Sequence, residues 1–182
     1  MKKIFFTAAL VLAIAGGLLL WGGVYASNFV KENLADQKIT FPSSEALTAQ
    51  GRDDLVSYAE ATVDTGDEAK AFASYIQGHI AKIANGQTYS EVSGQYQALT
   101  PEQKSTPEGE KLAEQRLTIF MGETLRGTLL NAYGWGFVAK IVLLAGAGLL
   151  AAAAVAATLF VLGNISSLPQ KSAKKKTTKR RK

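Results

Sequence analysis

Residues 128–144 read TLLNAYGWGFVAKIVLL, and they join what looks like the end of an amphipathic helix to the start of a hydrophobic run. The single charge in this stretch, Lys140, is followed at once by residues 141–163, which carry no charge. At about 1.5 Å of rise per residue, a run of this length crosses a hydrocarbon core of roughly 30 Å as a helix. We therefore expect Lys140 to mark the edge of a membrane span.

A second uncharged run, residues 4–24, lies near the start of the 182-residue chain and is also long enough to span a membrane. The sequence thus predicts a transmembrane helix at 4–26, and an interfacial segment followed by a second transmembrane helix at 134–163. An alternative for the first run is a cleaved secretory signal, because Val24-Tyr25-Ala26 resembles a cleavage site. The run is about twice as long as the core of a usual signal, which favours an uncleaved anchor.

Aromatic and basic side chains cluster at the outer ends of both runs, a pattern typical of membrane interfaces. An interfacial lysine extends its ammonium group to water while its stem stays in apolar surroundings. The expected membrane-interface residues are Trp21, Tyr25, Tyr133, Trp135 and Lys140. The alternative for Lys140 is a functional intramembrane lysine that binds a proton or an ion, although a full-length span remains without it.

Charge is divided unevenly along the chain. Lys2 and Lys3 precede the first span, and residues 164–182 form a polybasic tail with eight basic residues and no acidic one. Cytoplasmic flanks of spans are rich in lysine and arginine, so residues 1–3 and the tail are both expected in the cytoplasm. Residues 27–133 then lie outside the plasma membrane, and they hold all 15 acidic residues of the chain against nine basic ones. The tail is expected to bind anionic lipids rather than nucleic acid.

The external region has the signals of a helical domain. Thr65-Gly-Asp-Glu68 and Thr88-Tyr-Ser-Glu91 match the capping box, in which a hydroxyl and a carboxylate satisfy free amides at a helix start. Prolines after Thr100 and Thr106 favour the first turn of two further helices. We expect an extended piece ending at Pro42, followed by helices at 44–62, 66–84, 89–98 and 107–132. The chain has no cysteine, so disulfides cannot stabilise this domain.

The predicted fold class is an all-α membrane protein, with two transmembrane helices flanking an extracytoplasmic helical domain. Small residues recur at four-residue steps in both spans, which lets helix backbones approach closely. They are Ala9, Ala13 and Gly17 in the first span and Gly148, Ala152 and Ala156 in the second. These stripes fit packing against each other, packing against another protein, or the ordinary composition of membrane helices. Gly134 and Gly136 predict a bend in an otherwise continuous last helix.

The sequence contains no nucleophile elbow, phosphate loop or paired-histidine motif. His79, the one histidine, is expected to be packed or interfacial rather than to bind a metal. The acids between residues 64 and 68 lack the spacing of a calcium loop and suit a helix N-terminus instead. Glu123 and Arg126 either pair with each other at a three-residue step or contact a partner subunit. We therefore predict no catalytic residue, no metal and no cofactor.

Two stretches, NLADQKITFP at 33–42 and GETLRGTLLNAYGW at 122–135, resemble segments of small, functionally unassigned two-span membrane proteins of actinobacteria. The resemblance covers the edges of the external domain. It implies a plasma-membrane protein with an external helical domain, and it supplies no active site.

The leading functional hypothesis is a non-catalytic accessory or structural subunit of a larger plasma-membrane complex, for example a respiratory one. Its partners would be membrane protein subunits. The alternative is an extracytoplasmic sensor or ligand-binding module that signals through a separate partner. An enzyme that uses a buried carboxylate is a third option, and no residue pattern in the sequence supports it.

Overall fold

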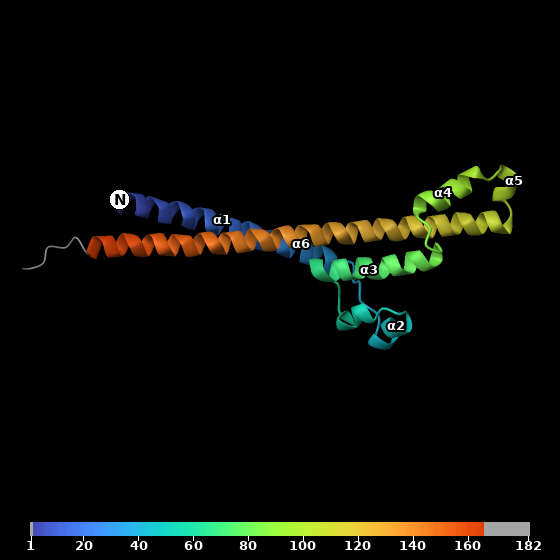
Figure 1. Cartoon of the computed structure of the whole chain (residues 1–182), viewed down its shortest axis with the longest axis horizontal. Coiled ribbons are helices and arrows are strands. Elements are labelled where there is room, and N and C mark those ends of the chain that lie inside the picture. Colours follow the sequence, from blue (N-terminus) through green and yellow to red (C-terminus); the bar gives the residue numbers. More distant parts are fainter. Residues whose placement is uncertain (1, 166–182) are drawn as a thin grey trace, which may run out of the picture. The chain divides into compact units, whose positions relative to one another are not determined.

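The computed structural model describes residues 2–165 of the chain, and it divides into two compact units. One, here the two-helix unit, consists in its described part of residues 2–20 and 144–165. The other, here the core unit, is Trp21–Leu143. Two long helices, α1 (Lys2–Ala35) and α6 (Pro107–Ile165), contribute to both units (Figure 1).

The part of the chain that the structure describes is mainly helical and has no strand, which confirms the all-α prediction. One isolated antiparallel bridge joins Thr40 to Thr62, so the expected extended piece before Pro42 is present. The core unit carries, between its two long helices, α2 (Ser44–Ala49), the 3-10 helix η1 (Asp53–Tyr58), α3 (Gly66–Ile83), α4 (Tyr89–Ala98) and α5 (Pro101–Lys104). Both α1 and α6 are long and apolar enough to cross a membrane.

The helix starts follow the sequence signals. The hydroxyls of Thr65 and Thr88 each accept a hydrogen bond from the amide three residues on. The carboxylates of Glu68 and Glu91 in turn accept one from the backbone amide of the capping threonine. The helix expected at 66–84 is present as α3, and it ends where Asn85, the residue after its cap, and Gly86 have positive φ angles of 50° and 79°. A left-handed residue of this kind closes a helix by satisfying its last carbonyls.

One helix prediction was wrong. The expected helix at 44–62 breaks after α2, at Gly51, whose φ of +73° lies outside the helical region. The chain then continues as η1, and Leu47 before the break and Leu55 after it are both buried in one core. Glycine adopts this angle without a steric cost, and that freedom permits the turn.

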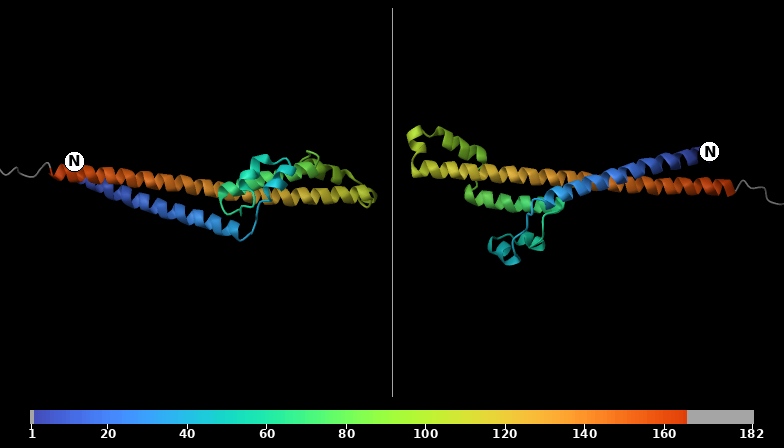
Figure 2. Two further views of the ribbon diagram at one scale, coloured as in Figure 1. Left: turned by 90° about the horizontal axis from the view of Figure 1, so that it is seen from below. Right: turned by 180° about the vertical axis from the view of Figure 1, so that it is seen from behind.

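Two apolar clusters stabilise the core unit. The larger one contains side chains from the end of α1, from residues 41–63 and from α3, together with Leu129 of α6. Its side chains Leu47 and Val63 are fully buried, and each contributes about 1.5–3 kcal/mol by leaving water. The smaller cluster joins α3 and α4 with Ile119 of α6. Both clusters therefore depend on α6, and Figure 2 shows α3 running alongside it.

In the two-helix unit α1 and α6 approach most closely at a pair of glycines. A Cβ atom added at Gly16 would lie 2.9 Å from the carbonyl oxygen of Gly146, and one added at Gly146 would lie 2.9 Å from the amide nitrogen of Leu20. Larger residues at either position would force the backbones apart. The rings of Phe6 and Phe160, with centroids 5.5 Å apart, add a second contact.

The predicted small-residue stripes lie beside this contact rather than at its centre. Gly17 and Gly148 have no atom within 4 Å of an added Cβ, and Ala13 and Ala152 are exposed. Ala9 and Ala156 are partly buried. One residue turns a helix by about 100°, so Gly16 and Gly146 are each displaced from the stripe that sequence spacing selects. Packing of the stripes against another protein stays a prediction.

Candidate functional site

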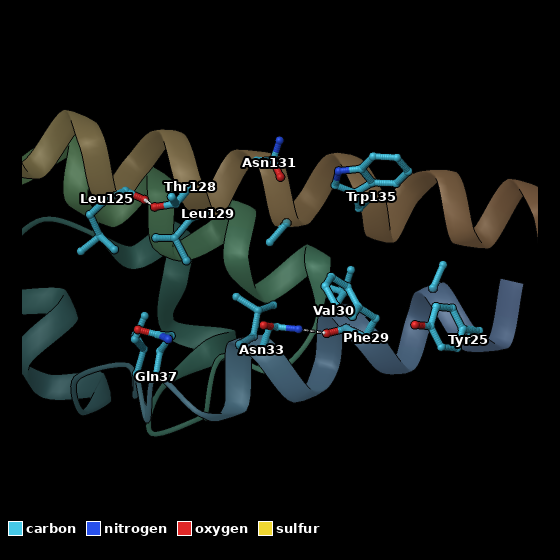
Figure 3. A pocket seen from close by; sticks show the side chains of 14 residues that line it. Tyr25, Phe29, Val30, Asn33, Gln37, Leu125, Thr128, Leu129, Asn131 and Trp135 are labelled. Carbon is cyan, nitrogen blue, oxygen red and sulfur yellow. Dashed lines mark hydrogen bonds between the residues drawn. The ribbon is translucent and has the colours of Figure 1, made fainter. Parts of the chain in front are cut away.

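The main hollow of the core unit is a cleft between the end of α1 and residues 125–135 of α6 (Figure 3). Its volume is about 590 Å³. This lies within the roughly 300–1,000 Å³ that is usual for small-molecule sites. The lining residues are Tyr25, Ala26, Phe29, Val30, Asn33, Leu34, Gln37, Ile39, Leu125, Thr128, Leu129, Asn131, Ala132 and Trp135.

The polar side chains of the cleft are all uncharged. Asn33 donates its amide to the carbonyl of Phe29 at 2.7 Å, and the Thr128 hydroxyl donates to the carbonyl of Leu125 at 2.8 Å. The side-chain amides of Gln37 and Asn131 make no hydrogen bond to any described residue. These two amides are thus available to water or to a bound molecule.

The cleft has an aromatic end and an amide end. Tyr25 and Trp135 lie at one end of the view in Figure 3, and Asn33 and Gln37 lie nearer the other. This order follows from the sequence, because α1 enters the core unit at Trp21 and reaches Gln37 only after its last turn. The aromatic end is the one nearer in sequence to the uncharged runs.

Of the five residues predicted at the membrane interface, Tyr25 and Trp135 line this cleft. Trp21 stacks on Tyr25 with ring centroids 6.1 Å apart. Tyr133 is half-buried, and the ammonium group of Lys70 lies 4.8 Å from its ring centroid. Their depth in a membrane stays a prediction.

Lys140 pairs with Asp67 in the first turn of α3, and the Nζ–Oδ2 distance is 2.5 Å. Beside this pair, a Cβ atom added at Gly136 would lie 3.3 Å from the Cα of Gly66. The start of α3 therefore rests directly on α6, and α6 stays helical through Gly134 and Gly136. Sequence reasoning missed this joint because its partners are separated by about 70 residues.

Glu123 and Arg126 form the expected ion pair, with 2.9 Å between Oε2 and Nη1. Their side chains are 42% and 28% exposed, so water still reaches both. A contact of either residue with a partner subunit stays a prediction. Glu123 and Arg126 are the charged residues of α6 nearest in sequence to the cleft, and they are paired with each other.

Arg52 forms a polar centre that sequence reasoning did not identify. It donates to both carboxylate oxygens of Asp54, at 2.9 and 2.8 Å, and to the backbone carbonyl of Ser74 at 2.7 Å. These hydrogen bonds lower the pKa of Asp54 and raise the pKa of Arg52. Because Ser74 is on α3, Arg52 ties the turn before η1 to that helix. The role is structural.

Across residues 2–165 no three histidine, cysteine, aspartate or glutamate side chains gather as metal ligands would. His79 is exposed and lies edge-on to the ring of Tyr75, at 4.6 Å between centroids. The polybasic tail, predicted to bind anionic lipids, lies outside the described residues.

No protein-family model matches the chain, and no curated protein or solved structure is significantly similar to it.

Proposed function

We propose that this chain is a two-span plasma-membrane protein and serves as a non-catalytic accessory subunit of a larger membrane complex. Both termini are cytoplasmic, and residues 27–133 are extracytoplasmic. The partners are membrane protein subunits, and a respiratory complex is one assembly of suitable kind. The proposal is supported by two long apolar helices, the division of charge, and an exposed apolar face on α6.

The observation that carries the docking role is this face, here called the α6 stripe. It consists of Leu117, Phe120, Met121, Leu125, Trp135 and Val138, each between 44% and 58% exposed. The charged residues of this part of α6, Glu123 and Arg126, lie on another side of the helix. A water-facing domain rarely leaves such a continuous apolar surface uncovered.

Polar residues within the α6 stripe are adapted to an apolar neighbour. The hydroxyls of Thr124 and Thr128 donate to carbonyls of the preceding turn, at 2.8 Å to Phe120 and 2.8 Å to Leu125. Threonines that bond back in this way hide their polar atom and present a methyl group. Between Leu117 and Leu125 the stripe therefore offers an apolar surface, and the exposed Asn131 interrupts it before Trp135.

The partner that fits is itself a membrane protein. The stripe passes at Val138 almost directly into the uncharged run at 141–163, so one partner helix can follow α6 along both parts. Each large side chain that such a helix covers contributes about 1.5–3 kcal/mol when fully buried. A partner confined to water would cover only those turns of α6 that lie outside the membrane.

The test is purification of the C-terminally tagged protein from its native membrane in mild detergent, followed by mass spectrometry. We expect a fixed set of membrane proteins in constant ratio to the tagged chain. The variant Met121→Glu, which places a charge in the stripe, should lose that set while the protein still inserts. Recovery of the wild-type protein alone, at its own mass, would overturn the proposal.

The cleft supports a second candidate, an extracytoplasmic ligand-binding module. A pocket of about 590 Å³ with two unused amides is larger than a packing defect. A small molecule that reproducibly raises the melting temperature of the whole protein would favour this candidate.

A further inference from the structure

We infer that the cleft between α1 and α6 binds an uncharged lipid, with its hydrocarbon chain at the aromatic end and a hydroxyl- or carbonyl-bearing head at the amide end. This inference rests on the membrane placement proposed above, and it assigns a ligand class that the accessory role does not require.

Charge is the first argument, and it excludes most phospholipids. None of the fourteen lining residues is charged. Three basic side chains near the cleft have acidic partners: Arg126 binds Glu123, Lys140 binds Asp67, and Lys31 lies 3.4 Å from Asp64. Lys38, between the lining residues Gln37 and Ile39, does not line the cleft itself. A phosphate or carboxylate among the lining residues would lose part of its hydration without meeting a cation in the lining, which is unfavourable. A neutral head group avoids this cost.

Polarity within the cleft is the second argument. Tyr25, Phe29 and Trp135 offer ring surface at one end, and each is more than half exposed and so free to cover a chain. Toward the other end lie Asn33 and Gln37 (Figure 3), and the amide of Gln37 supplies donors and an acceptor that no described residue uses. An amphiphile with one small polar head matches this gradient, whereas a uniformly apolar or uniformly polar ligand does not.

Access is the third argument. The aromatic end is formed where α1 and α6 leave the core unit toward their uncharged runs. Under the proposed topology this end meets the outer surface of the membrane, so a lipid chain enters sideways without crossing water.

The chain offers a matched pair of reporters, because it contains two tryptophans and only Trp135 lines the cleft. Full-length protein in detergent micelles is titrated with acyl-brominated diacylglycerol, phosphatidylcholine or phosphatidylglycerol, and tryptophan quenching is recorded. Trp21→Phe leaves Trp135 as the only reporter. Trp135→Phe leaves Trp21, which is 71% exposed, as the reference for non-specific partition.

We expect Trp135 to show saturable quenching by diacylglycerol at a lower mole fraction than by either phospholipid, while Trp21 responds equally to all three. Gln37→Leu should weaken diacylglycerol binding by about two- to tenfold, the effect of one lost hydrogen bond. Thr128→Phe should fill the cleft and remove the saturable part. Thr124→Phe, one turn away and outside the cleft, should leave it intact.

Equal, non-saturable quenching of both tryptophans by all three lipids would overturn the inference and leave the accessory role standing. Unchanged saturation in Thr128→Phe would also overturn it. Absence of any quenching of either tryptophan would show that the protein does not meet lipid, and would overturn the membrane placement itself.

Discussion

At the scale of single residues, Lys140 shows how a charge can border a hydrophobic run. It pairs with Asp67, but both side chains are nearly 60% exposed, so the pair contributes at most about 1 kcal/mol. The closer constraint at this joint is Gly136, where an added Cβ atom would lie 3.3 Å from the Cα of Gly66, tighter than ordinary van der Waals contact. Sequence spacing could place Lys140 at a boundary, yet it could not reveal either partner, because both belong to α3.

Substitution of Gly136 by valine should therefore destabilise the joint between α3 and α6. The added side chain would meet the backbone of Gly66, and overpacking of this kind costs about 1–3 kcal/mol. Gly134→Val is the matched control, because no atom lies within 4 Å of a Cβ there. Thermal unfolding of the full-length protein in detergent should show a lower Tm for Gly136→Val only. Equal Tm values for the two variants would contradict the observed close approach.

The Arg52–Asp54 contact predicts a dependence of stability on pH. Folding lowers the pKa of Asp54 because Arg52 hydrogen-bonds its ionised form. The stabilisation is thus complete above the ordinary value of 3.8 and is lost as the pH falls through the lower, folded pKa. Unfolding followed from pH 5 to about pH 2 should show a shallower acid loss in Asp54→Asn than in the wild type. Parallel curves would show that this carboxylate is not held in the folded state.

At the scale of secondary-structure elements, the sequence predicted correctly those features that depend only on neighbouring residues. The capping boxes at Thr65 and Thr88 depend on residues within one turn, and both were predicted from the sequence. The break at Gly51 was missed because its neighbours Leu47 and Leu55 fit a helix pattern, and only burial of both in one core selects the turn. The cleft was missed for a similar reason, since it is formed by α1 and α6, about 100 residues apart.

The capping box of α3 should have a measurable effect. Thr65→Ala removes the hydroxyl that accepts from the Glu68 amide, and loss of such a cap costs about 0.5–2 kcal/mol. Thr48→Ala serves as the control, because Thr48 is exposed on α2 and caps no helix. Denaturant unfolding should give a lower midpoint for Thr65→Ala than for Thr48→Ala. A midpoint unchanged in both would mean that α3 is held by packing alone.

At the scale of the whole molecule, composition and charge predict more about topology than about chemistry. The two uncharged runs lie within the longer helices α1 and α6, and the acidic residues fall between the runs. Neither pattern specifies a ligand or a partner, because those depend on which faces the fold leaves uncovered. The α6 stripe became visible only once the burial of each helix face was known.

The absence of cysteine makes the topology directly testable. Single cysteines placed at Gln77, exposed on α3, and at Lys3, before the first run, should react differently with a membrane-impermeant maleimide applied to intact cells. We expect labelling at position 77 without permeabilisation and at position 3 only after it. The opposite pattern would show that the orientation is the reverse of the one proposed. Labelling at both positions without permeabilisation would show that residues 4–26 do not span the membrane.

The central claim is that the α6 stripe contacts another membrane protein, and site-specific photo-crosslinking in native membranes tests it most directly. A photoreactive residue replaces Met121 in the stripe or, as control, Gln77 on the exposed side of α3. The account predicts one discrete cross-linked membrane protein from position 121 and none from position 77. Cross-links to lipid alone from position 121, or the same products from both positions, would contradict it.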